Sequence, residues 1–238
     1  YYRQLSPRTL LFLSQFLALV LGFIGLFGTI AVTALPTWKV SAFIGANLIV
    51  MEELWEGLWM TCYRQIDIKM QCKAYDSLLI LPAELQAARG LMCASIALVF
   101  ISLVVTGFGL KRINCCADNM RSKNITLAIG GSLYLISFLI TLIPVSWVGH
   151  SIIRQFYNPT SHDAQKRELG QALFIGWATS GILLVTGIIL LVRYDKRRLQ
   201  EDQLDNEIYL MEEKNVPKQD TVYQLKTESS LYKQKEYV

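Results

Sequence analysis

Four long stretches of the sequence are built mainly from apolar residues and contain no charged side chain. They lie between Arg8 and Lys39, between Arg89 and Lys111, between Lys123 and Arg154, and between Glu168 and Arg193. A helix needs about 20 apolar residues to cross the hydrocarbon core of a bilayer. The pattern therefore predicts four membrane-spanning helices, which we place at residues 9–34, 90–110, 126–147 and 169–192.

The first apolar stretch has two interpretations, a retained membrane helix and a cleaved signal peptide. A signal peptide has an apolar core of about 7–15 residues, and the stretch at residues 9–34 is longer than that. Ala31 and Ala34 are nevertheless small residues of the kind that a signal peptidase accepts. We expect the stretch to be retained as the first span.

The basic residues next to the ends of the spans orient the chain. Such residues gather on the cytoplasmic side of a membrane. Ten such residues fall on one side: Arg3, Arg8, Lys111, Arg112, Arg121, Lys123, Arg193, Lys196, Arg197 and Arg198. This predicts a cytoplasmic amino terminus (residues 1–8), inner loop (111–125) and tail (193–238), and it places the loops 35–89 and 148–168 outside.

The composition agrees with a membrane protein and leaves little room for a catalytic domain. Hydrophobic residues make up 53% of the chain and charged residues 18%, with a net charge of +4. These values exclude a soluble fold, and the small net charge gives no sign of nucleic-acid binding. His150 and His162 lack partners at catalytic spacing. We expect no enzymatic activity, no cofactor, and no small-molecule substrate other than permeating ions.

The first outer loop contains short β-prone stretches that are separated by turn-forming residues. The stretches are residues 38–43, 48–51 and 58–63, and the turns are residues 45–47 and 65–69. Residues 77–89 favour a helix that leads into the second span and has Pro82 near its start. The predicted fold is an α+β membrane protein, in which a four-helix transmembrane bundle carries a small antiparallel extracellular sheet formed by the two outer loops.

The topology limits how the five cysteines can pair. Cys93 lies in the second span and Cys115 and Cys116 lie in the inner loop, so only Cys62 and Cys72 face the oxidising exterior. We expect these two to form a disulfide, which stabilises such a short loop by about 3 kcal/mol on a chain-entropy argument. Two free surface thiols are the less favoured alternative. A metal site is not expected, because no histidine or third cysteine lies nearby.

The residues around these cysteines form a recognisable pattern. Trp38 is followed by Gly57, Leu58 and Trp59, then by Cys62 and Cys72, and by Arg89 at the start of the second span. This pattern resembles the signature of the claudin family, and the similarity covers roughly residues 9–192. Each tryptophan could also be an interfacial anchor, but the spacing to the cysteines favours packing of the outer sheet. The expected role of the signature is architectural.

The second outer loop strengthens the resemblance to claudins over their relatives. Residues 156–159 read Phe-Tyr-Asn-Pro, and residues 166–178 also resemble the claudin pattern. Peripheral myelin proteins and the gamma-type auxiliary subunits of ion channels share the first-loop signature but fit the second loop less well. Tetraspanins fit poorly, because their second outer loop carries several cysteines.

The resemblance implies assembly through the outer loops. Claudins polymerise side by side in one membrane and head to head between cells, so this chain is expected to bind itself and other claudins. Leu78 aligns with an apolar side chain that inserts into a pocket on the next protomer, and the pocket residues correspond to Phe156, Tyr157 and Leu169. The alternative is that Phe156 and Tyr157 pack only on their own sheet.

The resemblance also indicates which charges could select ions. Lys73 follows the second cysteine directly, at a position that the family uses to choose the sign of the ion, and Arg64 and Lys39 are further basic candidates. At an effective dielectric of 20, a unit charge about 5 Å from an ion contributes about 3 kcal/mol. These residues predict an anion-favouring channel or a cation barrier. They could alternatively be solvated charges away from any ion path.

The cytoplasmic segments contain three further features. Cys115 and Cys116 are candidates for palmitoylation beside the membrane. The acidic segment at residues 199–214 could form a short amphipathic helix. The carboxyl-terminal Tyr237 and Val238 fit a ligand for the PDZ domains of zonula occludens scaffold proteins, since such domains bind a terminal carboxylate and an apolar last side chain.

Two functions of different classes follow from these observations. The first is a plasma-membrane protein of the tight junction that forms a paracellular barrier or an ion-selective channel. The second is an auxiliary subunit or tetraspan organiser of another membrane protein, of the peripheral myelin or gamma-subunit type. Concentration at contacts between two expressing cells would separate the first from the second.

Overall fold

The computed structural model describes residues 7–42, 53–65, 68–77, 81–109, 120–159 and 166–215. The chain divides into two compact units, residues 1–194 and residues 195–238. Each unit is considered by itself. The first contains the helical bundle and the sheet, and the described part of the second is helical from residue 195 to Asn215.

Four long helices are present in the described part of the chain, and each contains a segment long and apolar enough to cross a membrane. They are α1 (Pro7–Ala34), α3 (Ala83–Phe108), α4 (Met120–Phe156) and α5 (Gln171–Asn215). The four spans expected from the uncharged stretches therefore fall on helices. The helices continue past the predicted spans, because helical backbone tolerates charged residues such as Glu84 and Arg154 once it leaves the hydrocarbon.

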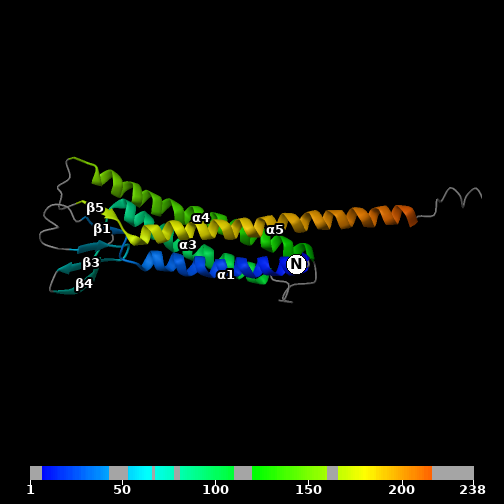
Figure 1. Cartoon of the computed structure of the whole chain (residues 1–238), viewed down its shortest axis with the longest axis horizontal. Helices are drawn as coiled ribbons and strands as arrows, with labels where there is room; N and C mark the ends of the chain where they lie inside the picture. The colour runs from blue at the N-terminus through cyan, green and yellow to red at the C-terminus, as the bar shows by residue number, and fades with distance from the viewer. Residues whose placement is uncertain are drawn as a thin grey trace, which may run out of the picture. The chain divides into compact units, whose positions relative to one another are not determined.

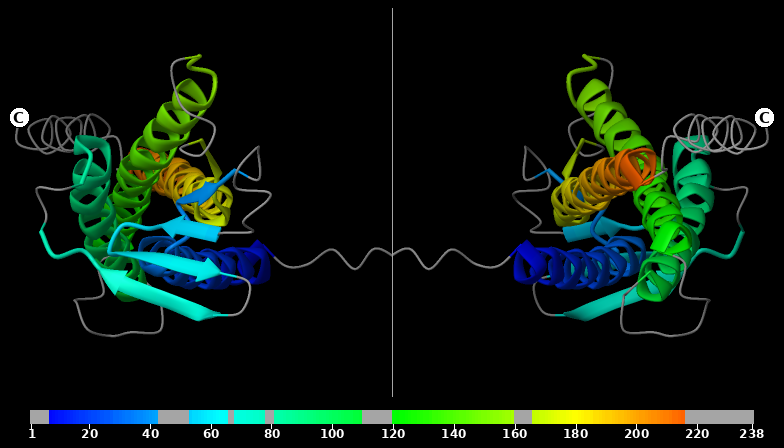
Figure 2. Two further views of the ribbon diagram at one scale, coloured as in Figure 1. Left: turned by 90° about the vertical axis from the view of Figure 1, so that its left-hand side faces the viewer. Right: turned by 90° about the vertical axis from the view of Figure 1, so that its right-hand side faces the viewer.

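A five-stranded antiparallel sheet lies across one end of the four helices (Figures 1 and 2). Its strands are β1 (Lys39–Ser41), β2 (Glu53–Glu56), β3 (Met60–Gln65), β4 (Ile68–Ala74) and β5 (Arg167–Leu169). The order in the sheet is β4-β3-β2-β1-β5, so the segment between α4 and α5 supplies the strand beside β1. The predicted fold class, a four-helix bundle with a sheet formed by both loops, is confirmed.

Several predicted element boundaries were wrong. The fourth span was started at Leu169, but Leu169 is the last residue of β5, and α5 begins at Gln171. At residues 65–69, where a turn was expected, Gln65 ends β3 and Ile68 begins β4, and these two residues pair as in an antiparallel hairpin, which agrees with a reversal of the chain in this region. The polar composition of β4 does not indicate a strand. It is compatible with one because β4 lies at the edge of the sheet, where both faces of a strand can be solvated.

Other boundaries also shifted at glycine and proline. The stretch at residues 58–63 becomes a strand only from Met60, because the Gly57 amide donates to the Met60 carbonyl (3.0 Å) and closes a turn. The helix expected over residues 77–89 begins at Ala83, after Pro82. The predicted strand 48–51 and turn 45–47 lie outside the described residues.

Two apolar clusters form the interior of the first unit. The outer cluster joins the sheet to the helix ends and includes Trp38, Leu58, Leu85, Met92, Ile152 and Leu173. The inner cluster lies among the helices and includes Ala18, Val99, Leu127, Tyr134, Leu183 and Leu190. Apolar side chains on the opposite helix faces are exposed, among them Phe16, Phe27, Phe100, Ile143 and Val185. A helix surface of exposed apolar side chains is suited to contact with lipid.

Small and hydroxylated residues let the helices approach one another. A Cβ atom on Gly25 would lie 2.6 Å from Leu183 Cδ2, and one on Gly28 would lie 2.6 Å from Thr179 Oγ1, so glycine permits the contact between α1 and α5. Ser95 of α3 and Thr141 of α4 share a buried hydrogen bond of 2.6 Å. Close packing and hydrogen bonds of this kind replace the hydrophobic effect as the cause of helix association in lipid.

Gly170 provides a test of how the sheet joins α5. Its amide donates to the Trp38 carbonyl (3.1 Å), and a Cβ at this position would collide with the Thr37 carbonyl oxygen and the backbone of Trp38. We expect Gly170→Ala to lower the free energy of unfolding by about 1–3 kcal/mol, as overpacking does. The measurement is the thermal unfolding midpoint of the purified protein in detergent.

Gly181→Ala is the matched control for this substitution. A Cβ at Gly181, which lies within α5, would meet no atom within 4 Å. Its midpoint should stay unchanged or rise slightly, because alanine favours a helix more than glycine does. Equal midpoints for the two variants would show that the backbone contact at Gly170 does not limit stability.

Candidate functional site

The site that we consider is the sheet together with the helix ends that support it, and Trp38 attaches the sheet to α1. The indole ring is fully buried, and its Nε1 donates a hydrogen bond to the Val32 carbonyl (2.8 Å) in the last turn of the helix. This bond satisfies one of the carbonyls that a helix end leaves without an intrahelical partner. The indole is also part of the outer cluster.

Gly57 lets the turn between β2 and β3 pass close to the end of α1. A Cβ at this position would collide with the backbone of Pro36, so only glycine fits here without a shift of the main chain. The Gly57 carbonyl accepts a hydrogen bond from the Tyr75 hydroxyl (3.2 Å). Burial raises the pKa of this hydroxyl above its usual value, so Tyr75 donates as a neutral phenol.

Arg89 joins α3 to the same turn. The side chain is buried, its Nε donates to the Leu58 carbonyl, and its guanidinium carbon lies 5.1 Å from the centre of the Trp59 ring and 5.3 Å from that of the Tyr75 ring. Arginine can make these contacts at once, because its planar cation donates in its plane while its face stacks on aromatic rings.

The predicted disulfide between Cys62 and Cys72 is confirmed. The two cysteines are directly opposite each other in β3 and β4, and their sulfur atoms are bonded. The residues of the predicted signature thus belong to one sheet and its supports: the bond closes the outer hairpin, Arg89 holds its base, and Trp38 holds β1 on the other side of β2. Cys93, which was expected to be unpaired in the second span, is free and exposed on α3.

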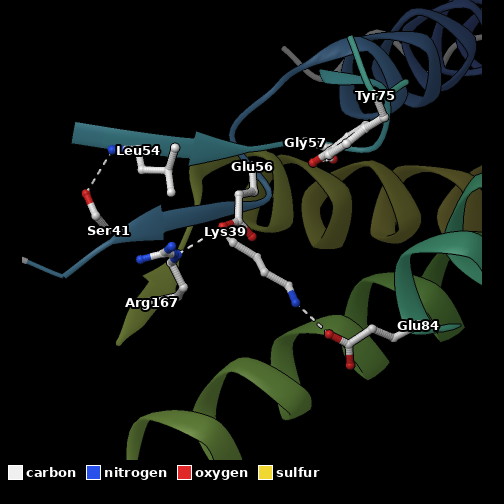
Figure 3. A network of polar contacts seen from close by, with 8 residues as sticks. All are labelled: Lys39, Ser41, Leu54, Glu56, Gly57, Tyr75, Glu84 and Arg167. Atoms are coloured by element: carbon white, nitrogen blue, oxygen red, sulfur yellow. Dashed lines mark hydrogen bonds and ion pairs between the residues drawn. The ribbon is translucent and has the colours of Figure 1, made fainter. Parts of the chain in front are cut away.

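Two ion pairs lie beneath the sheet, on the side that faces α3 and α4 (Figure 3). The Lys39 ammonium lies 2.5 Å from the Glu84 carboxylate, and Arg167 Nε lies 3.1 Å from a Glu56 carboxylate oxygen. Lys39 is buried. The expectation that Lys39 faces permeating ions is therefore not supported by its position, because the lysine points inward to a carboxylate of α3.

The other two candidate selectivity residues are exposed and also lie near carboxylates. Lys73 Nζ lies 2.6 Å from Asp76, with both side chains largely exposed, and Arg64 lies 3.7 Å from Glu53. Exposed pairs of this kind are weak, at about 0–1 kcal/mol. Lys73 can therefore exchange its partner for a passing anion, but its field is partly compensated by Asp76.

Three of the residues expected to take part in assembly, Phe156, Tyr157 and Leu169, are described, and their surroundings differ. Phe156 and Tyr157 lie at the end of α4 with their ring centres 5.5 Å apart, and the Lys166 ammonium lies 5.8 Å from the Phe156 ring. Tyr157 is 78% exposed, whereas Leu169 is partly buried against the outer cluster. Phe156 thus has a partner in its own loop, and Tyr157 is directed outward.

Some of the predicted site residues lie outside the described residues. These are Leu78, Cys115, Cys116, Tyr237 and Val238. Among the residues that are described, no group of histidine, cysteine, aspartate or glutamate side chains could hold a metal ion.

Sequence reasoning missed the partner of Lys39 and the second ion pair beneath the sheet. Glu56, Glu84 and Arg167 belong to β2, α3 and β5, and they meet only in the folded chain. The position of Glu56 directly before the Gly57 turn could have indicated that its side chain lies near the bundle. No local pattern marks Glu84 as the partner of Lys39.

Comparisons with known proteins agree with these features. The family model described as the PMP-22/EMP/MP20/Claudin family matches residues 12–190. Claudin-17 of Sus scrofa is 51% identical over 176 residues, which cover 74% of this chain and 78% of that protein. Claudin-8 of Mus musculus is 51% identical over 175 residues, covering 74% and 78%. Claudin-3 of Homo sapiens is 48% identical over 170 residues, covering 71% and 77%.

Substitution of Arg89 tests the support of the sheet. Arg89→Ala leaves the Leu58 carbonyl without its donor, a loss of about 1–3 kcal/mol, and removes the cation from two rings. We expect a lower thermal midpoint and less protein at the cell surface. Arg154→Ala, at an exposed position of α4, is the control and should change neither. A normal midpoint for Arg89→Ala would mean that the disulfide alone holds the hairpin.

Proposed function

This chain belongs to the PMP-22/EMP/MP20/Claudin family, and from that premise we propose that it is a claudin of the tight junction, which assembles within and between plasma membranes into a paracellular barrier or an ion-selective channel. The observation that carries the proposal is the sheet built from both loops and fastened to the bundle by Trp38 and Arg89. A rigid sheet of this kind can present the same residues to a neighbouring copy each time. The proposed role is structural and channel-forming, with no enzymatic step.

The proposed orientation places the sheet outside and both termini in the cytoplasm. The basic residues beside the spans support it, because Lys196, Arg197 and Arg198 follow the last apolar segment, and Arg3 and Arg8 flank the first. The disulfide supports it independently, since such bonds persist on the oxidising side of the membrane.

The contact between cells is proposed to involve the aromatic end of α4. Tyr157 exposes 78% of its surface and lies beside Phe156 and Lys166. A protruding aromatic ring of this kind is a frequent centre of binding energy in protein interfaces. Phe156 already lies beside the Lys166 ammonium. We therefore propose that Phe156 supports the Tyr157 ring and does not insert into the neighbouring molecule. Leu78 remains the proposed side-by-side contact.

Adhesion can be tested in cells that make no junctions of their own. We expect the protein to concentrate where two expressing cells touch, and Tyr157→Glu to reduce this enrichment at least about fivefold, because a charge replaces an interface ring. Tyr209→Glu is the control, since Tyr209 is a comparably exposed tyrosine in the tail segment. The measurement is the ratio of fluorescence at contacts to fluorescence on free membrane.

The same assay can contradict the proposal. Enrichment that also occurs where an expressing cell touches a non-expressing cell, or no enrichment at all, would favour an auxiliary subunit that binds a partner in its own membrane.

Ion selectivity is proposed to favour anions through Lys73. Lys73 is exposed in the edge strand β4, and Lys69 is exposed in the same strand, whereas Lys39 is buried beneath the sheet. The nearby Asp76 opposes this preference, so the selectivity should be moderate. Arg64 contributes less, because its side chain is less exposed than that of Lys73 and it too has a carboxylate nearby.

Two substitutions should move the selectivity in opposite directions. Lys73→Asp reverses one charge and should raise sodium permeability relative to chloride several-fold, because about 3 kcal/mol per unit charge acts on an ion 5 Å away. Asp76→Asn removes the carboxylate beside Lys73 and should lower the ratio. The sodium-to-chloride permeability ratio of both variants is measured from dilution potentials, across monolayers that contain matched amounts of junctional protein. If neither substitution changes the ratio, the ions pass elsewhere or the strands form only a barrier.

On the cytoplasmic side, two attachments complete the proposal. Palmitoylation of Cys115 and Cys116 would hold the inner loop at the membrane. Binding of Tyr237 and Val238 to PDZ domains of zonula occludens scaffold proteins would connect the tail to the junctional scaffold.

A further inference from the structure

A cleft of about 630 Å³ opens beneath the sheet, where β1, β2 and β5 meet the ends of α3 and α4. Its volume is within the range of about 300–1,000 Å³ that is typical of small-ligand sites. The charged residues that line it form the two ion pairs of Figure 3, Lys39 with Glu84 and Arg167 with Glu56. Neither the barrier nor the ion path proposed above makes use of this cleft.

The carboxylates are the more accessible members of both pairs. The side chain of Glu84 is 18% exposed against 5% for Lys39, and that of Glu56 is 26% exposed against 17% for Arg167. A cation that enters the cleft would therefore meet carboxylate oxygens first. Arg167 binds Glu56 through Nε, which leaves its two terminal amino groups as donors for an anionic oxygen.

Trp147 gives the cleft an aromatic wall. This tryptophan of α4 lines the cleft and is 50% exposed. The face of an indole ring attracts a quaternary ammonium, and aromatic rings combined with carboxylates are a common way to bind choline. The cleft thus presents two carboxylates, an aromatic wall and an arginine, with Lys39 the least exposed of its charged side chains, and this set matches a ligand that carries a quaternary ammonium and a phosphate.

The direction of the cleft indicates where the ligand comes from. Trp147 and Gln155 both line it and lie eight residues apart on α4, which corresponds to about 12 Å along a helix axis. Ile143, one turn before Trp147, is 52% exposed on the apolar surface of the helix. The cleft therefore extends from the lipid-facing part of α4 to its polar last turn.

We propose that this cleft binds the phosphocholine headgroup of a bilayer lipid. Glu84, Glu56 and Trp147 surround the trimethylammonium, and Arg167 donates to the phosphate. Neither a free metal cation nor inorganic phosphate fits as well, because each would meet two like charges in the same cleft. The lipid is bound with its acyl chains beside Ile143, so the sheet is supported by a lipid as well as by the bundle. This inference goes beyond the proposed function and does not depend on it.

The test uses the full-length protein in nanodiscs with photoactivatable lipids. Phosphatidylcholine and phosphatidylglycerol analogues carry the same reactive group near the glycerol, and mass spectrometry quantifies labelling of the peptide that contains Trp147 and Gln155. We expect the choline lipid to label this peptide several-fold more than the glycerol lipid. Trp147→Leu should reduce the labelling about fivefold, the size expected for one cation–π contact.

Glu56→Gln should reduce the labelling too, because it removes a carboxylate from the cleft. Glu168→Gln is the matched control, since Glu168 is exposed and strand alternation places it on the opposite face of β5 from Arg167. If Glu56→Gln does not fold, the proposal is tested by comparing the labelling of Trp147→Leu with that of Glu168→Gln. Equal labelling by both lipids or unchanged labelling in Trp147→Leu would each overturn the proposal.

Discussion

The contact of Arg89 with the turn after Gly57 is the interaction on which the rest of the outer structure depends. A sheet this small buries too little apolar surface to be stable without support. Arg89 supplies that support from the first turns of α3, because one side chain satisfies the Leu58 carbonyl and lies against two rings.

The disulfide and the arginine act on different parts of the same hairpin. The bond between Cys62 and Cys72 restricts the unfolded loop and keeps β3 and β4 in register. It does not attach the sheet to the membrane bundle. Arg89 attaches the hairpin, and Trp38 attaches the β1 side of the sheet. Together they hold the outward residues of the sheet, including Lys73, at fixed positions relative to the helices, which is what repeated assembly of identical copies requires.

The bundle is stabilised by a different principle. Apolar residues face lipid, and the helix contacts depend on Gly25, Gly28 and the hydrogen bond between Ser95 and Thr141. Between bundle and sheet lies the polar layer of Lys39, Glu84, Glu56 and Arg167. Its charges are compensated within the protein, because uncompensated charges at the edge of a low-dielectric region are costly. The layer can therefore lie next to lipid headgroups without destabilising the fold.

Much of this protein could be predicted from the sequence because lipid allows few alternatives. Uncharged stretches of sufficient length must form helices there, and once they are placed, only Cys62 and Cys72 can meet an oxidant. Local chemistry likewise indicated the outer sheet and the structural role of the signature. The strand order, the pairing of β5 with β1, and the burial of Lys39 could not be predicted. Lys39 and Glu84 are far apart in the chain, and whether a lysine faces an ion path or a carboxylate depends on which helix end lies beneath it. That was decided by tertiary packing, because an ion pair depends on distance in space, and local sequence patterns do not contain that distance.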